Sequence, residues 1–140
     1  AHPDVRAVIS VNKGLVTQAS AAIPVVPLYF AILYKVMKRA GNHENCIQQI
    51  ARLFTQKLYT PEGFRTDENG FIRMDDYELL PEIQEEVKKC WKAVTTDTVN
   101  QYCDIDGYWE DFYHMFGFHY SDIDYTQDVD ANVEINGIVM

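Results

Sequence analysis

Residues 5 to 11 alternate in the way that predicts a β-strand. The residues on one side of this segment are all apolar: Val5, Ala7, Ile9 and Val11. Because Val8 on the opposite side is also apolar, the pattern is typical of a parallel strand covered on both faces. Asn12-Lys13-Gly14 ends the strand, and a second short strand is expected at Phe71–Met74, after a turn rich in polar residues and glycine.

A long uncharged segment follows and predicts a buried helix within Thr17–Ala40. Residues 19–34 contain no charged side chain. This stretch is nevertheless shorter than the ~20 residues that span a bilayer, and Pro24 and Pro27 interrupt its beginning. We therefore expect a helix that is buried or lines an apolar pocket, and no membrane span. Gly41 is expected just beyond its C-terminal end.

Four further helices are predicted downstream. The first spans Glu44–Leu58, with an apolar stripe made of Ile47, Ile50, Ala51, Phe54 and Leu58. The second begins at Pro81, and its buried stripe is Ile83, Val87, Cys90, Trp91 and Val94. A short helix is expected at Asp97–Tyr102. The last runs from Asp106, as the N-cap, to Gly117, with Tyr108, Phe112, Met115 and Phe116 facing inward. The acidic tail, residues 121–140, is expected to be irregular.

Composition and charge narrow the class of protein. The chain has 140 residues, 47% of them hydrophobic, and a net charge of −9. This supports one folded domain and argues against a protein that binds duplex DNA. The charge is uneven, since residues 1–57 carry seven basic and two acidic residues, whereas residues 58–140 carry five basic and nineteen acidic ones. Only the first third could therefore face a phosphate or an acidic partner.

Cysteines and histidines give little sign of a disulfide or metal site. The cysteines are Cys46, Cys90 and Cys103, far apart and odd in number. This favours buried thiols in a reducing, cytoplasmic compartment. The four histidines have no zinc-binding spacing, and residues 122–130 lack the glycine and glutamate of a calcium loop. Since the chain does not begin with Met, we expect it to be a piece of a longer protein or a processed one.

The segment Lys13–Ser20 carries the most informative chemistry. A predicted parallel strand ends in a glycine turn, followed by Thr17 and by small residues that open a helix. Ligands of open α/β sheets bind beyond the carboxyl ends of the strands. Backbone N–H groups at the start of a helix, together with a hydroxyl, can hold a phosphate or a carboxamide. The alternative is that Thr17 or Ser20 only caps the helix, and the spacing alone does not decide between the two.

Residues 11–29, which read VNKGLVTQASAAIPVVPLY, closely resemble the trans-2-enoyl-CoA reductases and the related V-type bacterial enoyl-acyl-carrier-protein reductases. The resemblance continues through Ile72–Leu79 and Phe116–Phe118 and covers nearly the whole chain. It implies an α/β fold, the C-terminal third of an enlarged Rossmann-type reductase. Residues 1–17 would supply the sixth, last Rossmann strand and a cofactor loop, residues 18–60 the substrate-side helices, and residues 61–140 an edge strand and a helical cap.

The resemblance also implies a cofactor, a substrate and site residues. In this family the loop Leu15-Val16-Thr17 contacts NADH, and the apolar helix from Ile23 through Leu33 lines the acyl pocket. Ile23 and Leu28 are therefore expected at the substrate, with ordinary core packing as the alternative. The partners would be acyl-CoA or acyl-carrier protein, together with the rest of the reductase chain.

No catalytic residue is assigned to this chain. The family's glycine-rich loop and its Tyr-x8-Lys pair would lie upstream, so the fragment alone is expected to be inactive. Tyr29 and Lys38 have the same spacing, but nine positions turn a helix by about 900° and place them on opposite faces. A free-standing helical interaction domain without catalysis is the competing interpretation.

Overall fold

The structure, a computed structural model, describes residues 7–128. Its strands are β1 (Ile9–Val11) and β2 (Phe71–Arg73), which pair in parallel with Ile9 opposite Phe71 and Val11 opposite Arg73. The prediction of a parallel strand followed by a second strand near Phe71 is therefore confirmed. Each strand has three residues, so β1 is shorter than the predicted Val5–Val11 and no longer than its partner; Val5 lies outside the described residues.

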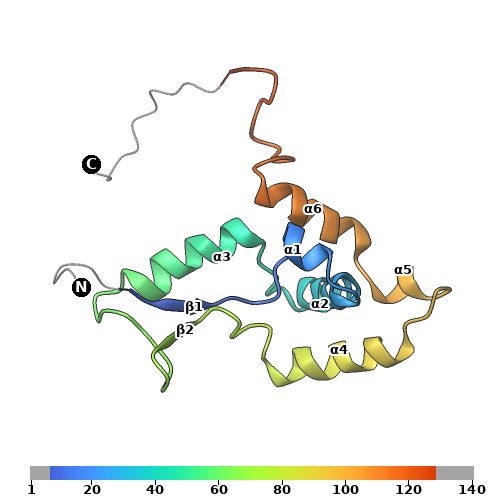
Figure 1. The fold of residues 1–140 in the computed structure, drawn as a ribbon, viewed down its shortest axis with the longest axis horizontal. Helices are drawn as coiled ribbons and strands as arrows, with labels where there is room; N and C mark the ends of the chain where they lie inside the picture. Colours follow the sequence, from blue (N-terminus) through green and yellow to red (C-terminus); the bar gives the residue numbers. More distant parts are fainter. Residues whose placement is uncertain (1–6, 129–140) are drawn as a thin grey trace.

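The expectation that both faces of the first strand are covered is wrong for the described chain. Val8 and Ile9 are 41% and 60% exposed. The side chain of Ile72 in β2 is fully buried. Figure 1 shows the two strands and α3 (Cys46–Arg52) on one side of the molecule, apart from most of the other helices. Since the helices gather mainly around one another, part of the sheet surface remains in contact with solvent.

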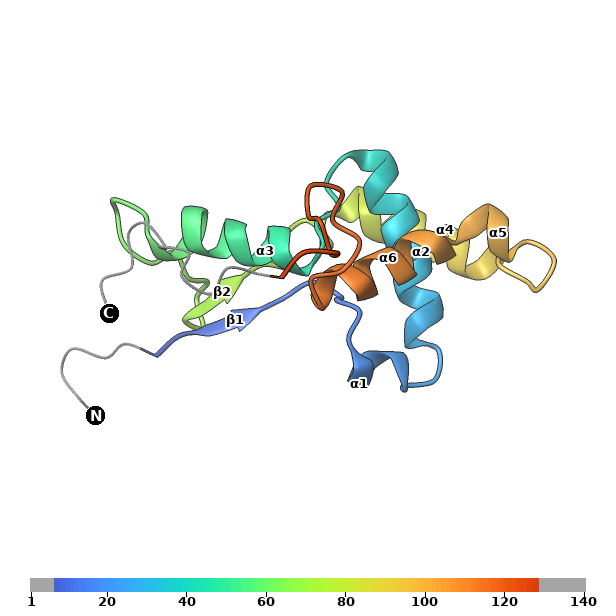
Figure 2. The ribbon, with the colours of Figure 1, turned by 90° about the horizontal axis from the view of Figure 1, so that it is seen from above.

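Helix α2 (Val26–Ala40) is the centre of the fold and confirms the predicted buried helix. The predicted segment also contains α1 (Gln18–Ala21), which precedes Pro24. Gly41 ends α2 in the left-handed conformation, with φ 75°, as expected of a glycine at this position. Figures 1 and 2 show α2 crossing α4 (Pro81–Ala93), against which it packs along with α6 (Ile105–Met115).

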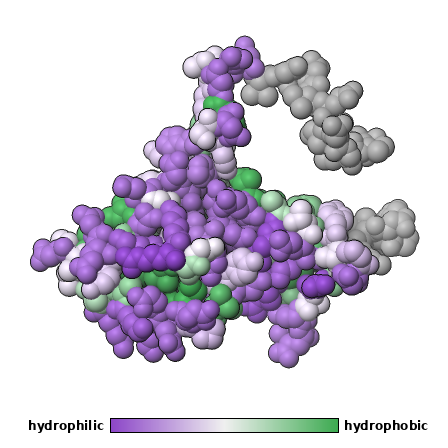
Figure 3. All heavy atoms as spheres, turned by 180° about the vertical axis from the view of Figure 1, so that it is seen from behind, coloured by the Kyte–Doolittle hydropathy of each residue, from purple (hydrophilic) through white to green (hydrophobic). Residues whose placement is uncertain are grey.

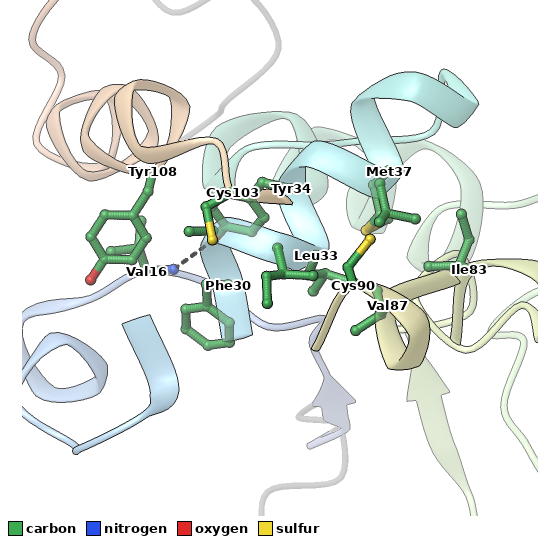
Figure 4. Packing of buried hydrophobic residues seen from close by; sticks show 13 residues of the cluster. Val16, Phe30, Leu33, Tyr34, Met37, Ile83, Val87, Cys90, Cys103 and Tyr108 are labelled. Carbon is green, nitrogen blue, oxygen red and sulfur yellow. Dashed lines mark hydrogen bonds between the residues drawn. The ribbon is translucent and has the colours of Figure 1, made fainter. Parts of the chain in front are cut away.

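The hydrophobic core forms where these three helices meet, as Figure 4 shows. The most deeply buried side chains of α2 are Ile32, Leu33, Tyr34 and Met37. They meet Ile83, Val87 and Cys90 of α4, so three of the five residues in the predicted α4 stripe are buried, whereas Trp91 is 39% exposed. Cys90 and Cys103 are buried free thiols, and burial raises the pKa of both.

The predicted helix Glu44–Leu58 forms, but its buried face is not the predicted one. It consists of α3 and a π-helical segment, η1 (Leu53–Leu58). Its buried residues are polar, Gln49 and Arg52, while Ile47, Ile50 and Phe54 are each more than 40% exposed. Arg52 pairs with Glu44 at 2.7 Å and donates to the Met74 carbonyl at 3.0 Å. These bonds hold the polar face of α3 against the rest of the protein.

The remaining predicted helices are present with small shifts. α5 is Val99–Tyr102. The N-cap of α6 is Asp104, whose carboxylate accepts from Gly107 N–H at 3.0 Å, so the prediction of Asp106 as the cap is wrong. In α6, Tyr108 is buried and Phe112 is partly buried, whereas Phe116, the residue after the helix, is 46% exposed. Figure 3 shows apolar patches among the hydrophilic side chains of the surface. Within residues 7–128, no helix has the length and hydrophobicity to cross a membrane.

Candidate functional site

The loop from Asn12 to Thr17 leaves the carboxyl end of β1 and runs along α2. Gly14 lies so close to the ring of Phe30 that a Cβ atom added there would stand 2.5 Å from Cε1. Only a glycine permits this approach without moving the ring. The loop therefore rests directly on α2, the helix for which the resemblance to the reductases implies contact with the acyl chain.

Glu78 and Tyr34, from other parts of the chain, hold the backbone of this loop at Gly14 and Val16. Gly14 N–H donates to Glu78 Oε2 at 2.6 Å. The Tyr34 hydroxyl donates to the Gly14 carbonyl at 3.1 Å and accepts from Val16 N–H at 3.0 Å, a bond marked in Figure 4. Tyr34 is fully buried. Residues 14–16 are thus fixed by polar contacts as well as by packing, which is the rigidity that ligand binding benefits from.

Thr17 is the N-cap of α1. Its Oγ1 accepts from Ser20 N–H at 3.0 Å, and the Ser20 hydroxyl accepts from Thr17 N–H at 2.8 Å, which forms a capping box. The N–H groups of Gly14, Val16 and Thr17 therefore all donate within the protein. The expected cluster of exposed N–H groups for a phosphate is not formed by these three.

Within residues 14–17, one backbone donor and one backbone acceptor stay available. Among residues 7–128, Leu15 N–H and the Val16 carbonyl have no hydrogen-bond partner. The Leu15 carbonyl accepts from the Ser20 hydroxyl at 3.2 Å. The loop thus offers an N–H and a C=O in neighbouring residues, a set suited to a carboxamide. The Thr17 hydroxyl donates to the Ser20 hydroxyl at 3.2 Å and accepts from Ser20 N–H, so it adds one further acceptor lone pair.

Lys13 is a charged residue in a buried position that the sequence did not single out. It is only 3% exposed, and its Nζ lies 4.5 Å from the centroid of the Tyr34 ring. Burial lowers the pKa of Lys13 to about 8, against the attraction of Asp111 and Glu78. His43 packs against the same Tyr34 ring at 4.6 Å and contacts Asp111 at 3.0 Å. A polar cluster therefore underlies the loop.

The two residues predicted at the substrate lie in different environments. Leu28 is partly buried against the core and lines an apolar cavity with Ala31, Cys103 and Tyr108. Ile23, in the connection between α1 and α2, is 51% exposed. Core packing, the alternative to substrate contact, therefore accounts for the buried part of the Leu28 side chain. Ile23 is exposed and available for contact with other groups.

Tyr29 and Lys38 belong to separate clusters, as their helical spacing predicts. The Tyr29 hydroxyl donates to Glu78 Oε1 at 2.6 Å, while Lys38 Nζ pairs with Asp104 at 2.7 Å. Lys35 donates to the backbone carbonyl of Asn100 in α5 and to that of Cys103 just after it. Much of the positive charge of the first third is thus used inside the fold. Within the described part of the chain, no three His, Cys, Asp or Glu residues are placed to share a metal ion.

Sequence reasoning missed Glu78, Tyr34 and Lys13, which surround the loop. Glu78 lies in an acidic segment that looks like solvated surface, and Tyr34 lies in an apolar run that looks like plain core. The one available signal is that Glu78 lies within Ile72–Leu79, a segment that resembles the reductases, and that Tyr34 follows residues 11–29, another such segment. Their contacts span sequence separations of 64 and 18 residues, which local patterns do not reveal.

Comparison with known proteins places the chain among the enoyl reductases. The family model for the trans-2-enoyl-CoA reductase catalytic region matches residues 1–59, and that for the enoyl reductase FAD binding domain matches residues 66–129. An enoyl-[acyl-carrier-protein] reductase [NADH] of Cytophaga hutchinsonii is 51% identical over 134 residues, covering 96% of this chain and 34% of that protein. One from Coxiella burnetii is 50% identical, with 96% and 33% covered.

Solved structures agree with these relatives. A trans-2-enoyl-CoA reductase of Treponema denticola in complex with NAD has a TM-score of 0.78 and 47% identity, covering 91% of this chain and 32% of that one. The enzyme of Clostridium acetobutulicum in complex with NAD has a TM-score of 0.76 and 48% identity, with 89% and 32% covered. The chain spans about a third of the length of these proteins, and with both family models and all these relatives in agreement, it belongs to the family of the trans-2-enoyl-CoA and NADH-dependent enoyl-[acyl-carrier-protein] reductases.

Proposed function

We propose that the full-length protein is an NADH-dependent reductase of enoyl thioesters and that this chain is the C-terminal part of its Rossmann-type fold. In this arrangement β1 is the last strand of the parallel sheet, β2 is the edge strand, and residues 18–60 form the substrate side. The observation that supports it best is the loop after β1. It leaves the carboxyl end of a parallel strand, where ligands of such sheets bind, and Glu78 and Tyr34 fix its backbone.

The residues of this loop fit the carboxamide of NADH. A carboxamide has an oxygen that accepts and an NH2 group that donates. Leu15 N–H and the Val16 carbonyl offer the complementary groups, and Thr17 adds a hydroxyl. One family model carries FAD in its name, but the relatives are named for NADH and the solved structures hold NAD. We therefore assign the loop to NADH.

The residues of this chain would bind and orient NADH and the acyl chain. They would not take part in the hydride or proton transfer itself. When bound, NADH supplies the hydride that is transferred to the β-carbon of the enoyl thioester. The loop 15–17 would fix the cofactor amide, while Ile23, Leu28 and the N-terminal half of α2 would contact the acyl chain. The partly exposed Leu28, beside an apolar cavity, suits such a chain.

The substrate would be an acyl-CoA or an acyl-carrier protein, and the reaction would belong to fatty acid synthesis. The three free thiols among the described residues are consistent with a cytoplasmic enzyme. The test is an assay of the full-length protein, in which oxidation of NADH is followed with crotonyl-CoA or an enoyl-acyl-carrier protein. We expect NADH consumption and a saturated thioester product, and absence of turnover with both substrates would contradict the proposal.

A further inference from the structure

Glu78 connects two elements that the proposed function assigns to different ligands. It lies between β2 and α4 and is 9% exposed. One carboxylate oxygen accepts from Gly14 N–H in the loop after β1, and the other accepts from the Tyr29 hydroxyl of α2, both at 2.6 Å. The partners are 64 and 49 residues away in the sequence, so the carboxylate ties together three separate parts of the chain.

The segment that carries Glu78 is itself anchored. The Gln84 side chain donates to the Glu78 backbone carbonyl at 2.8 Å. Upstream, Arg52 donates to the Met74 carbonyl at 3.0 Å and pairs with Asp76 at 2.9 Å. Because its backbone is held on both sides, the carboxylate is a fixed point rather than a mobile surface group. Hydrogen bonds to a charged acceptor are also stronger than those between neutral groups.

Tyr29, the second partner of the Glu78 carboxylate, is also held in place. The Tyr29 side chain is partly buried, and burial together with its bond to Glu78 raises the pKa of the Tyr29 hydroxyl to about 12. The hydroxyl therefore keeps its proton at neutral pH and donates to Glu78. Next to Tyr29, Phe30 packs against Gly14. A shift of α2 at this level would be transmitted to the loop through both contacts.

We infer that Glu78 is a positioning residue that couples the acyl-side helix α2 to the NADH loop through its bonds to Tyr29 and Gly14. The inference rests on the proposed function of the loop. Glu78 needs no contact with either ligand, since it fixes Gly14 while the next three residues bind the cofactor. A change at Tyr29, on the helix assigned to the acyl chain, should therefore alter the binding of NADH.

The test uses five variants of the full-length protein, three at Glu78 or Tyr29, one double variant and one control. The Kd for NADH, the KM and kcat for the enoyl thioester, and Tm are measured on each. Glu78→Ala removes both bonds, and we expect the Kd for NADH to rise about tenfold. Glu78→Gln keeps an oxygen for Gly14 N–H and an NH2 group for the Tyr29 oxygen, so the rise should stay within about threefold. Tyr29→Phe removes only the link to α2, and we expect a rise of about threefold.

The matched control is Glu82→Ala, an exposed glutamate in the first turn of α4. It should leave the Kd for NADH unchanged. In the Glu78→Ala background, Tyr29→Phe should have no further effect on NADH binding, because the bond it removes is already absent.

The possible outcomes separate the inference from the proposed function. A wild-type protein without reductase activity contradicts the function, whatever the variants do. If the wild type is active but Glu78→Ala and Tyr29→Phe lower only Tm and leave the Kd for NADH unchanged, Glu78 is structural and the inference is wrong. If Glu78→Ala does not fold, Tyr29→Phe decides, since an unaltered Kd in that variant overturns the inference.

Discussion

Lys13 shows how burial changes a single residue at the site. Its ammonium group lies over the Tyr34 ring and, among the described residues, has no carboxylate within ion-pair distance. Asp111, Glu78 and Glu44 attract it from farther away, but the loss of hydration dominates and lowers the pKa of Lys13 to about 8. The charged form is therefore less stable in the folded protein than in the unfolded chain.

This shift predicts a pH dependence of stability. The pKa of an unfolded lysine is about 10.4, so between pH 8 and about 10.5 the unfolded state binds more protons than the folded state. Stability from this group then rises with pH across that window and is lost as pH falls to 8. Between pH 8 and about 10.5, this contribution of Lys13 to the free energy of unfolding changes by about 3 kcal/mol. We expect the free energy of unfolding of the wild type to increase by this amount relative to Lys13→Met, measured in urea at pH 7.5 and pH 10.5.

The comparison with Lys13→Met is necessary because other groups titrate in the same range. Burial raises the pKa of Cys90 and Cys103, which makes the folded state less stable as pH rises. These effects are common to both proteins and cancel in the difference. If the free energy of unfolding changes with pH in the same way in the wild type and in Lys13→Met, Lys13 does not contribute to the pH dependence of stability.

Thr17 has a structural role as well as a proposed binding role. Thr17→Val keeps the shape and removes the hydroxyl. Loss of the cap should cost about 1 kcal/mol at most, because α1 has only four residues and its opening is local. If the hydroxyl also binds NADH, the Kd for NADH in the full-length enzyme should rise by roughly threefold to tenfold. Fluorescence titration and thermal unfolding measure the two effects.

Ser20→Ala is the matched control for this prediction. It removes the other half of the capping box and keeps the Thr17 hydroxyl. We expect a similar loss of stability with a much smaller change in NADH affinity. Equal effects of the two variants on NADH binding would mean that Thr17 acts only as a cap.

At the scale of the elements, the cap of α6 shows a choice that local pattern did not resolve. Asp104 and Asp106 are both acceptable N-caps by residue type. The structure selects Asp104, because its carboxylate reaches Gly107 N–H at 3.0 Å and also pairs with Lys38 of α2 at 2.7 Å. The contact with Lys38 therefore favours Asp104 over Asp106, although the two are equivalent as N-caps by residue type.

This difference is directly testable. Asp104→Ala removes the cap and the ion pair, and we expect a loss of about 1–2 kcal/mol in the free energy of unfolding. Asp106→Ala, in the first turn of the same helix, should cost only about 0.3 kcal/mol from its interaction with the helix dipole. Urea denaturation of both variants provides the comparison, and a larger loss for Asp106→Ala would contradict the assignment.

Helix α3 and η1 show the opposite case, in which the strongest local signal was misleading. The apolar stripe at Ile47, Ile50 and Phe54 predicts a buried face, yet these side chains are exposed in the described chain. Arg52 is instead held inward by Glu44, Asp76 and the Met74 carbonyl. A buried arginine with several acceptors therefore helps to set which face of the helix points inward.

At the scale of the whole molecule, several apolar side chains are exposed in a chain that spans only part of the length of its relatives. Four apolar side chains are all more than 40% exposed: Val8 just before β1, Ile9 in β1, and Ile47 and Ile50 on α3. Apolar surface of this kind is typical of an interaction face. The chain spans about a third of its relatives, which agrees with the proposal that the active enzyme contains more than these residues.

We therefore expect the 140-residue chain alone to have no reductase activity. The chemistry would require the glycine-rich loop and the Tyr/Lys pair that the resemblance places upstream. The measurement is NADH oxidation with crotonyl-CoA, compared with a reaction without protein and with the full-length enzyme. Turnover by the 140-residue chain above the blank would refute this expectation.

The sequence by itself determined the helices with clear start and stop signals, such as α2 with Gly41 after it and α4 with Pro81 at its start. It also indicated that β1 is a parallel strand, from the apolar residues on both of its sides. These features depend on neighbours within a few positions, which the order of residues specifies directly.

Only the tertiary structure decided which face of α3 is buried, which aspartate caps α6, and how the loop after β1 is held. Glu78 and Tyr34 contact this loop across 64 and 18 residues, and Arg52 crosses 22 residues to Met74. Polar partners at such separations leave no periodic signal in the chain. Their energy depends on burial and on the geometry of each bond, and both exist only after the helices have packed.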